Sequence, residues 1–137
     1  MNIWLCPVKP KNWRTAKTNK LFGVPKRGLK IFRQVQTDDL LVFHVLKPAG
    51  GIVSICRVTS EIFEDHQDIW GKDRYPFRVR IELQEFIRDE DKPIPLSHLF
   101  GKTDNEITIE PYLRHVGITK ISQEQFKKLK ELFKQDT

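Results

Sequence analysis

The sequence predicts a single α+β domain over residues 1–137, built as a small, partly closed β-barrel flanked by helices. Segments with the apolar content or alternation of strands outnumber helical segments. The strand–helix–strand spacing of a parallel sheet does not recur along the chain. A chain of 137 residues, 39% of them hydrophobic, suits one domain with its own core.

The N-terminal third is predicted to hold one strand and two short helices. Residues 2–8 are rich in large apolar side chains and end at prolines, which is typical of a strand. A proline at position 10 can occupy the first turn of a helix, expected over residues 10–19. Residues 21–25 contain Gly and Pro and are expected to form a loop. Apolar residues spaced by three predict a second helix over residues 28–35.

The middle of the chain is predicted to be mostly strand. Two apolar runs, residues 40–46 and 52–62, flank a Pro-Ala-Gly-Gly segment, which predicts a β-hairpin. Residues 64–76 are expected to form a polar loop. Residues 77–83 alternate strictly between apolar and charged side chains, so a strand with one buried face and one wet face is expected there.

The C-terminal part is predicted to hold a short helix, a closing strand and a longer final helix. Prolines precede the short helix, expected over residues 96–100, and residues 117–121 are expected to form the strand. Ser122 and Gln125 have the spacing of a capping box, which marks the start of the last helix. One face of that helix is expected to pack on the core through its apolar side chains: Phe126, Leu129, Leu132 and Phe133.

The formal net charge is +6, and it is unevenly distributed. Residues 1–37 contain no Asp or Glu but carry nine cations: Lys9, Lys11, Arg14, Lys17, Lys20, Lys26, Arg27, Lys30 and Arg33. A field of one sign favours polyanionic partners such as nucleic acid, while a solvated basic surface kept for solubility is the alternative.

Cellular context is predicted from what the chain lacks. The N-terminus has no pattern of a signal peptide, and no apolar run approaches the roughly 18 residues of a membrane span. Cys6 and Cys56 both lie in apolar segments, which favours buried free thiols. We therefore expect a cytoplasmic protein without a membrane partner.

No catalytic motif is found in the sequence, so we expect a protein that is not an enzyme. His44 lies in the predicted hairpin, where a core or barrel-mouth imidazole is favoured over a general base. His66 lies among acidic residues that lack the fixed spacing of a zinc or calcium site. Phosphate-binding and nucleophile motifs are also absent. No cofactor and no metal are therefore expected.

The order of several short motifs carries a family resemblance over nearly the whole chain. The motifs are Trp4-Leu5-Cys6, Asn12-Trp13, Phe22-Gly23-Val24-Pro25-Lys26, 39–45, 51–53, 58–61, 75–79 and 113–121. In this order they resemble the stand-alone EVE domains of the PUA-like superfamily, which are related to the YTH readers of methylated adenine. The resemblance implies a PUA-like barrel that encloses a flipped base among aromatic side chains.

The resemblance also implies a set of site residues. Phe22 stands where the family usually has Trp, and Trp70 or Tyr75 supplies the second wall. Asn12 and His44 are candidates for the polar edge of the base. The full base-pocket set is Phe22, Gly23, Val24, Asn12, Trp13, His44, Trp70 and Tyr75. Phosphates are expected on the cations Lys26, Arg27, Lys30, Arg33 and Arg114.

Three functions are compatible with the sequence. The leading hypothesis is a reader of methylated cytosine or adenine, with stacking that restores roughly 1–3 kcal/mol per flipped base. A general RNA-binding PUA-like module, indifferent to modification, is the second. An RNA-processing enzyme of the ASCH type is the third. The choice of base, the choice between DNA and RNA, and the oligomeric state stay open.

Overall fold

The computed structural model describes residues 1–46, 50–100 and 118–136. Its centre is one mixed sheet whose strand order is β2-β6-β4-β3-β1-β7, with β5 paired to β6. The strands are β1 (Ile3–Val8), β2 (Leu21–Val24), β3 (Leu40–Val45), β4 (Gly51–Val58), β5 (Phe63–Glu64), β6 (Phe77–Phe86) and β7 (Thr119–Lys120). The helices are α1 (Pro10–Asn19), α2 (Leu29–Phe32), α3 (Leu96–Phe100) and α6 (Gln123–Gln135), with a 3-10 turn η1 over Lys26–Gly28.

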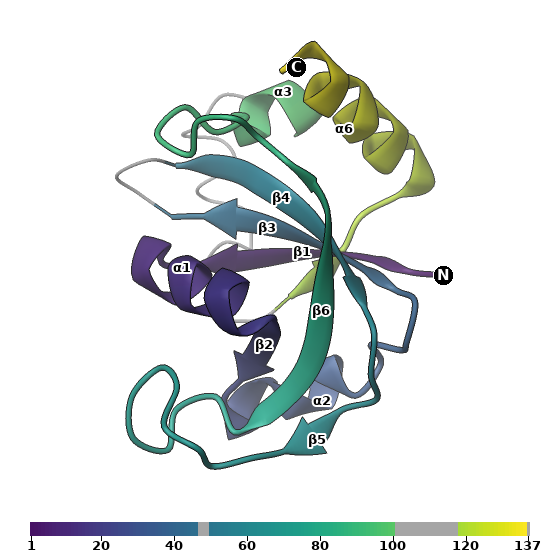
Figure 1. Ribbon diagram of the computed structural model, residues 1–137. Coiled ribbons are helices and arrows are strands. Elements are labelled where there is room, and N and C mark those ends of the chain that lie inside the picture. Colours follow the sequence, from purple (N-terminus) through teal and green to yellow (C-terminus); the bar gives the residue numbers. More distant parts are fainter. Residues whose placement is uncertain (47–49, 101–117, 137) are drawn as a thin grey trace.

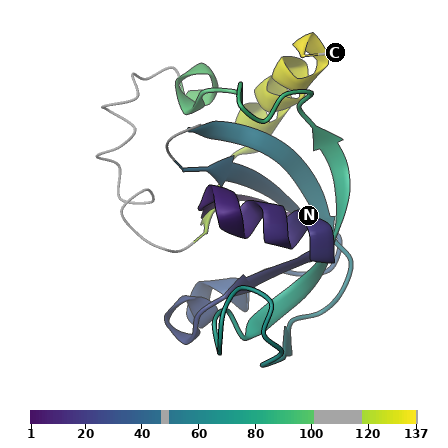
Figure 2. The ribbon, with the colours of Figure 1, turned by 60° about the vertical axis from the view of Figure 1, so that its left-hand side comes forward.

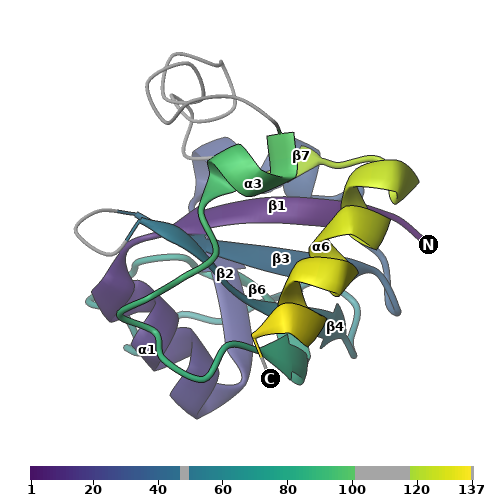
Figure 3. The ribbon, with the colours of Figure 1, turned by 90° about the horizontal axis from the view of Figure 1, so that it is seen from above.

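The sheet curls into a half-barrel with helices around it (Figure 1). The long strand β6 bends across the molecule, and α1 lies in the concave side of the curl (Figures 1 and 2). Seen from above, α3 and α6 lie side by side and cover the opposite side of the sheet (Figure 3). The predicted α+β class and partly closed barrel are therefore confirmed.

The elements with strong local periodicity lie where they are predicted. β3 and β4 form the antiparallel hairpin, whose turn residues 47–49 lie outside the described part. α3 begins and ends at the predicted residues. Ser122 and Gln125 form both hydrogen bonds of the capping box, and Leu129 and Phe133 of α6 are buried.

Two predictions about local structure are wrong, and one strand pairing lies outside what the sequence predicts. Residues 21–24 form strand β2 because they pair antiparallel with β6, which outweighs the local preference of Gly and Pro. The helix predicted over residues 28–35 is shorter and consists of η1 and α2. β1 pairs parallel with β3, although the sequence shows no recurring parallel spacing.

The core lies on both faces of the curled sheet, under α1 on one side and under α3 and α6 on the other, and it includes both cysteines. Trp4 is buried, and its Nε1 donates to the Asp39 carboxylate at 3.0 Å. Burial raises the pKa of Cys6 well above its ordinary value and that of Cys56 to about 12, so both stay thiols. Cys6 and Cys56 are free and buried, as the sequence predicts.

In the described ranges, no helix is long and apolar enough to cross a membrane.

Candidate nucleic-acid interface

A small pocket lies between α1, β2 and the loop that leads into β6. Its volume is about 90 Å³. Its walls are Pro7, Val8, Lys9, Asn12, Ala16, Phe22, Gly23, Val24, Pro25, Trp70 and Tyr75. Six of the eight residues of the predicted base-pocket set are brought together here, although they come from three separate segments of the chain.

Trp70 and Tyr75 form one wall of the pocket, and both are half-buried. Their rings meet edge to face, with centroids 5.8 Å apart. The Trp70 Nε1 donates to the Asn12 carbonyl at 3.3 Å, and the Asn12 Nδ2 donates to the Tyr75 hydroxyl at 3.2 Å. Asn12 therefore ties the two aromatic rings of the loop to the first turn of α1.

Phe22 forms the facing wall, and it is also a core residue. Only 7% of its surface is exposed. Its ring packs edge to face against Phe32 at 5.8 Å and Phe43 at 5.2 Å between centroids. The sequence predicts a loop over residues 21–25, but residues 21–24 form β2, and this strand places the Phe22 ring in the core.

Gly23 allows the loop to approach β2 closely. A Cβ at this position would lie 2.7 Å from the Tyr75 carbonyl oxygen and 2.9 Å from the Tyr75 Cβ, distances that side chains do not tolerate. Tyr75 itself has φ of 53°, a left-handed conformation that is rare for a bulky residue. Strained residues of this kind persist only where the surroundings hold them. The absence of a side chain at Gly23 is thus part of what positions Tyr75.

Arg78 is the residue that the sequence reading missed. It lies in β6 within the alternating segment, which predicts a wet side chain, yet it is fully buried. Its Nε donates to the Tyr75 carbonyl at 3.0 Å, and its Nη2 donates to the Gln67 carbonyl at 2.6 Å. The guanidinium also lies over the Trp70 ring, 5.1 Å from its centroid, and 3.5 Å from the Asp65 carboxylate. Arg78 therefore fixes both ends of the loop that carries the aromatic wall.

The structure does not bring Trp13 or His44 to this pocket. Trp13 is buried on another side of α1, where its ring centroid lies 4.9 Å from that of Phe43, and its Nε1 has no hydrogen-bond partner among the described residues. His44 follows Phe43 in β3, so its side chain points to the other face of the sheet. Neither residue lines the pocket that the other six form.

His44 is predicted to make the fold sensitive to acid. Burial lowers the pKa of His44 from 6.5 to about 4. Between these two pH values the imidazole is protonated in the unfolded chain and neutral in the folded chain. Stability is therefore lost as the pH falls from 6.5 towards 4. Linkage gives a loss of about 2 kcal/mol between pH 7 and pH 5 for this group alone. Urea unfolding at both pH values, for the native chain and His44→Leu, measures it. An equal loss in both proteins would contradict the prediction.

Four of the predicted phosphate-binding cations follow the pocket wall along the chain. Lys26, Arg27, Lys30 and Arg33 are exposed, and they begin directly after Pro25 of the pocket wall. None of these four forms an ion pair with a residue in the described ranges. Lys9 adds a fifth cation at the rim, while Arg114 lies outside the described residues.

The described part of the pocket offers stacking surfaces and hydrogen-bonding groups rather than reactive ones. Within residues 1–46, 50–100 and 118–136, no group of three or more His, Cys, Asp or Glu side chains lies close enough to hold a metal ion. The polar side-chain groups of the walls are the Asn12 amide, the Tyr75 phenol, the Trp70 indole N–H and the Lys9 ammonium. This arrangement suits the binding of a flat, polar-edged ring.

The curled mixed sheet with helices on both sides defines a PUA-like α+β domain. The chain belongs to the EVE domain family, whose model matches residues 2–132. A UPF0310 protein of Pyrococcus horikoshii is 31% identical over 139 residues, covering 82% of this chain and 94% of that protein. A UPF0310 protein of Pyrococcus abyssi is 32% identical, covering 82% and 95%.

Solved structures share this fold at low sequence identity. A hypothetical protein from Leishmania major has a TM-score of 0.70 at 12% identity, covering 98% of this chain and 96% of that chain. The Mmi1 YTH domain, solved in complex with RNA, has a TM-score of 0.66 at 12% identity, covering 98% and 78%. A YTH domain of Zygosaccharomyces rouxii, in complex with N6-methyladenosine RNA, has a TM-score of 0.66 at 14% identity, covering 96% and 86%.

Proposed function

We propose that this chain is a non-enzymatic nucleic-acid-binding protein that reads a modified base, a methylated cytosine or adenine, in the pocket between α1, β2 and the Trp70 loop. The observation that carries the proposal is the convergence of Phe22, Trp70, Tyr75 and Asn12 on one recess, whose wall is followed in the chain by exposed cations that form no ion pair with a described residue. The fold shared with two YTH domains solved with RNA supports it. The free thiols of Cys6 and Cys56 agree with a cytoplasmic location.

Each part of the site has a physical role in this proposal. A flipped base loses its stacking in the strand and regains it between aromatic rings. The Asn12 side chain uses only Nδ2 within the described residues, which leaves Oδ1 to accept from the base edge. Lys26, Arg27, Lys30, Arg33 and Arg114 would hold the phosphates on either side. A buried methyl group adds about 0.8 kcal/mol, or roughly a fourfold preference.

The recess is too small to enclose a base unless one of its wall residues moves. At about 90 Å³ it lies well below the ~300 Å³ lower limit of pockets that engulf a whole ligand. Trp70 is a half-buried wall residue whose Nε1 makes one hydrogen bond, to Asn12, and whose ring contacts Arg78 and Tyr75. We therefore infer that Trp70 swings outward when a base enters and then closes on its face.

The test compares short oligonucleotides that carry methylcytosine, methyladenine or the plain base, as RNA and DNA, at two salt concentrations. Trp70→Ala is expected to lose about tenfold or more in affinity for the preferred oligonucleotide, because one stacking face is removed. Trp70→Phe is the matched control, since it keeps an aromatic ring and loses the Nε1 donor and part of the ring area. It should retain most of the preference.

The competing function has a different outcome. If all oligonucleotides bind alike, respond only to salt and ignore Trp70→Ala, the base-reading proposal fails. A general RNA-binding module, held by phosphate contacts alone, would then be the better description.

A further inference from the structure

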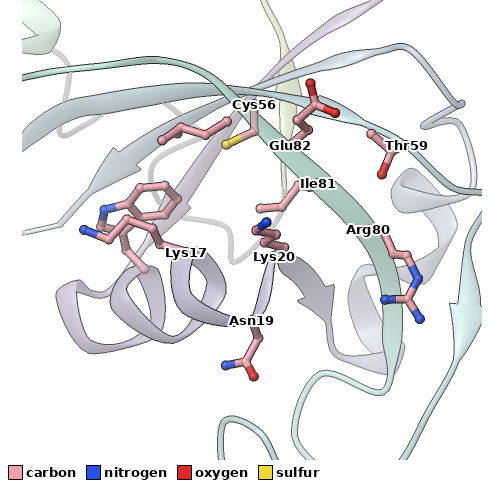
Figure 4. A pocket seen from close by; sticks show the side chains of 10 residues that line it. Lys17, Asn19, Lys20, Cys56, Thr59, Arg80, Ile81 and Glu82 are labelled. Atoms are coloured by element: carbon pink, nitrogen blue, oxygen red, sulfur yellow. The ribbon is translucent and has the colours of Figure 1, made fainter.

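A second and larger recess lies on the other side of α1 from the base pocket. We call it the α1–β6 groove. Its volume is about 590 Å³, and its walls come from Trp13, Lys17, Asn19, Lys20, Cys56, Thr59, Arg80, Ile81, Glu82 and Leu83. Figure 4 shows the side chain of Lys17 at the left and that of Arg80 at the right, with Lys20 and Ile81 between them. The base-reading function does not use it.

The floor of the groove is apolar and continues into exposed apolar side chains. Trp13, Cys56 and Ile81 are buried, at 5% exposure or less, whereas Leu83 is 41% exposed. Leu83 pairs with Cys56, and Phe86 pairs with Ser54, two residues from Cys56. Phe86 and Leu83 therefore lie on the same face of the sheet as the groove floor. Phe86 is 63% exposed, which leaves its ring free as a stacking surface beyond the groove.

The rim of the groove is positively charged. Lys20 and Arg80 are exposed, and neither forms an ion pair within the described residues. Lys17 pairs with Glu90 at 2.6 Å, an exposed contact that a phosphate can replace. The one acid of the wall, Glu82, is paired with Arg57, and Figure 4 shows its carboxylate directed away from Lys20. Cations around exposed aromatic and apolar side chains are the arrangement that binds single-stranded nucleic acid.

Helix α1 separates the groove from the base pocket, and its sequence provides a path between them. Asn12 and Ala16 line the pocket, while Trp13 and Lys17 line the groove. The helix has no acidic residue, and Lys11, Arg14 and Thr18 are exposed on it. A strand that leaves the pocket therefore meets cations as it crosses the roughly 10 Å width of the helix towards the groove. Figure 2 shows α1 in front of the sheet, where nothing described covers it.

We propose that the α1–β6 groove binds the single-stranded segment next to the base held in the pocket. Its phosphates contact Lys20 and Arg80, and one of its bases stacks on Phe86. This inference rests on the proposed function, because the strand is the one whose flipped base occupies the pocket. It predicts that the chain covers more than one nucleotide, within the ~4–16 nucleotide range of single-strand binding folds.

The test measures affinity for a trinucleotide centred on the preferred base and for a longer single strand of about ten nucleotides. The variants are Lys20→Gln with Arg80→Gln, and Phe86→Ala; all three positions are exposed, so the fold is preserved. For the longer strand, the double variant is expected to reduce the slope of log K against log salt by about 1.4, the value for two lost phosphate contacts. Phe86→Ala is expected to weaken it about tenfold, as the loss of one stacked base does.

The control is Lys127→Gln with Lys128→Gln, which removes the same charge from the exposed surface of α6. It should leave both affinities close to native. Ribose and deoxyribose versions of the longer strand show which nucleic acid the groove prefers.

The outcomes separate the groove from the pocket. Unchanged affinity of the groove variants for the longer strand, with normal trinucleotide binding, overturns the groove and leaves base reading intact. If the groove variants lose affinity for the longer strand while Trp70→Ala keeps the native affinity, the groove is supported and base reading is overturned. If neither oligonucleotide binds the native chain, both proposals are wrong.

Discussion

Arg78→Met is expected to lower the free energy of unfolding by about 3 kcal/mol and to abolish selective base binding. The buried guanidinium donates to the carbonyls of Tyr75 and Gln67, and hydrogen bonds from a charged donor contribute roughly 1.5–3 kcal/mol each. Methionine fills the space but donates nothing, so both carbonyls lose their partner. The loop then no longer holds Tyr75 at its positive φ or Trp70 under the guanidinium.

Urea denaturation with an unchanged m value measures the stability loss, and the trinucleotide assay measures binding. Arg80→Met is the matched control, because it removes the same group two residues along the same strand where the side chain is exposed. It should alter stability by no more than about 0.5 kcal/mol. A small effect of Arg78→Met, similar to that of Arg80→Met, would show that the loop is held in another way.

The contrast between Arg78 and Arg80 shows where sequence reasoning reaches its limit. Both belong to the same alternating segment, and the alternation correctly predicts the strand. However, it places both arginines on the wet face, whereas the loop before β6 covers the Arg78 side chain and β2 and β5 flank it within the sheet. What covers a strand face is decided by segments distant in sequence, so the local pattern does not contain it.

The same limit explains strand β2. Its four residues include Gly23 and are followed by Pro25, so they favour a loop locally. They form a strand because β6 supplies the hydrogen-bonding partner, and Gly23 is required there by the close approach of Tyr75. The capping box and the α6 face are predicted correctly because their signals lie within a single turn or helix.

The sequence predicts which residues form the candidate site more successfully than it predicts where their side chains lie. Asn12, Phe22, Trp70 and Tyr75 come from the family resemblance, and they do meet around one recess. Trp13 and Asn12 are neighbours in sequence, but successive residues of a helix are rotated by about 100° around its axis. The two side chains therefore line different recesses. His44 is removed from the pocket by the alternation of β3 in the same way. The base-reading role of all these residues stays a prediction.

Phe22→Ala is expected to cost about 3–5 kcal/mol of unfolding free energy, the usual loss for a buried phenylalanine. The ring contacts Phe32 and Phe43, and its removal leaves a cavity beneath the pocket. Trp70→Ala should cost much less, about 1 kcal/mol, because Trp70 is half-buried in a loop. Urea unfolding of both variants, with the exposed Phe86→Ala as control, measures the difference. Equal costs for Phe22 and Trp70 would contradict the assignment of Phe22 to the core.

This difference decides how the two walls of the pocket can be tested. If Phe22→Ala fails to bind a base, the loss of binding can come from unfolding or from the missing stacking surface. The experiment does not separate these two causes. Phe22→Leu keeps most of the apolar volume at a cost of about 1–2 kcal/mol and removes only the flat ring. If Phe22 also stacks on the base, Phe22→Leu at a temperature where it is fully folded should weaken binding about as much as Trp70→Ala. If Phe22→Leu binds the base with native affinity, the Phe22 ring serves only the core. The base is then held from the Trp70 side alone.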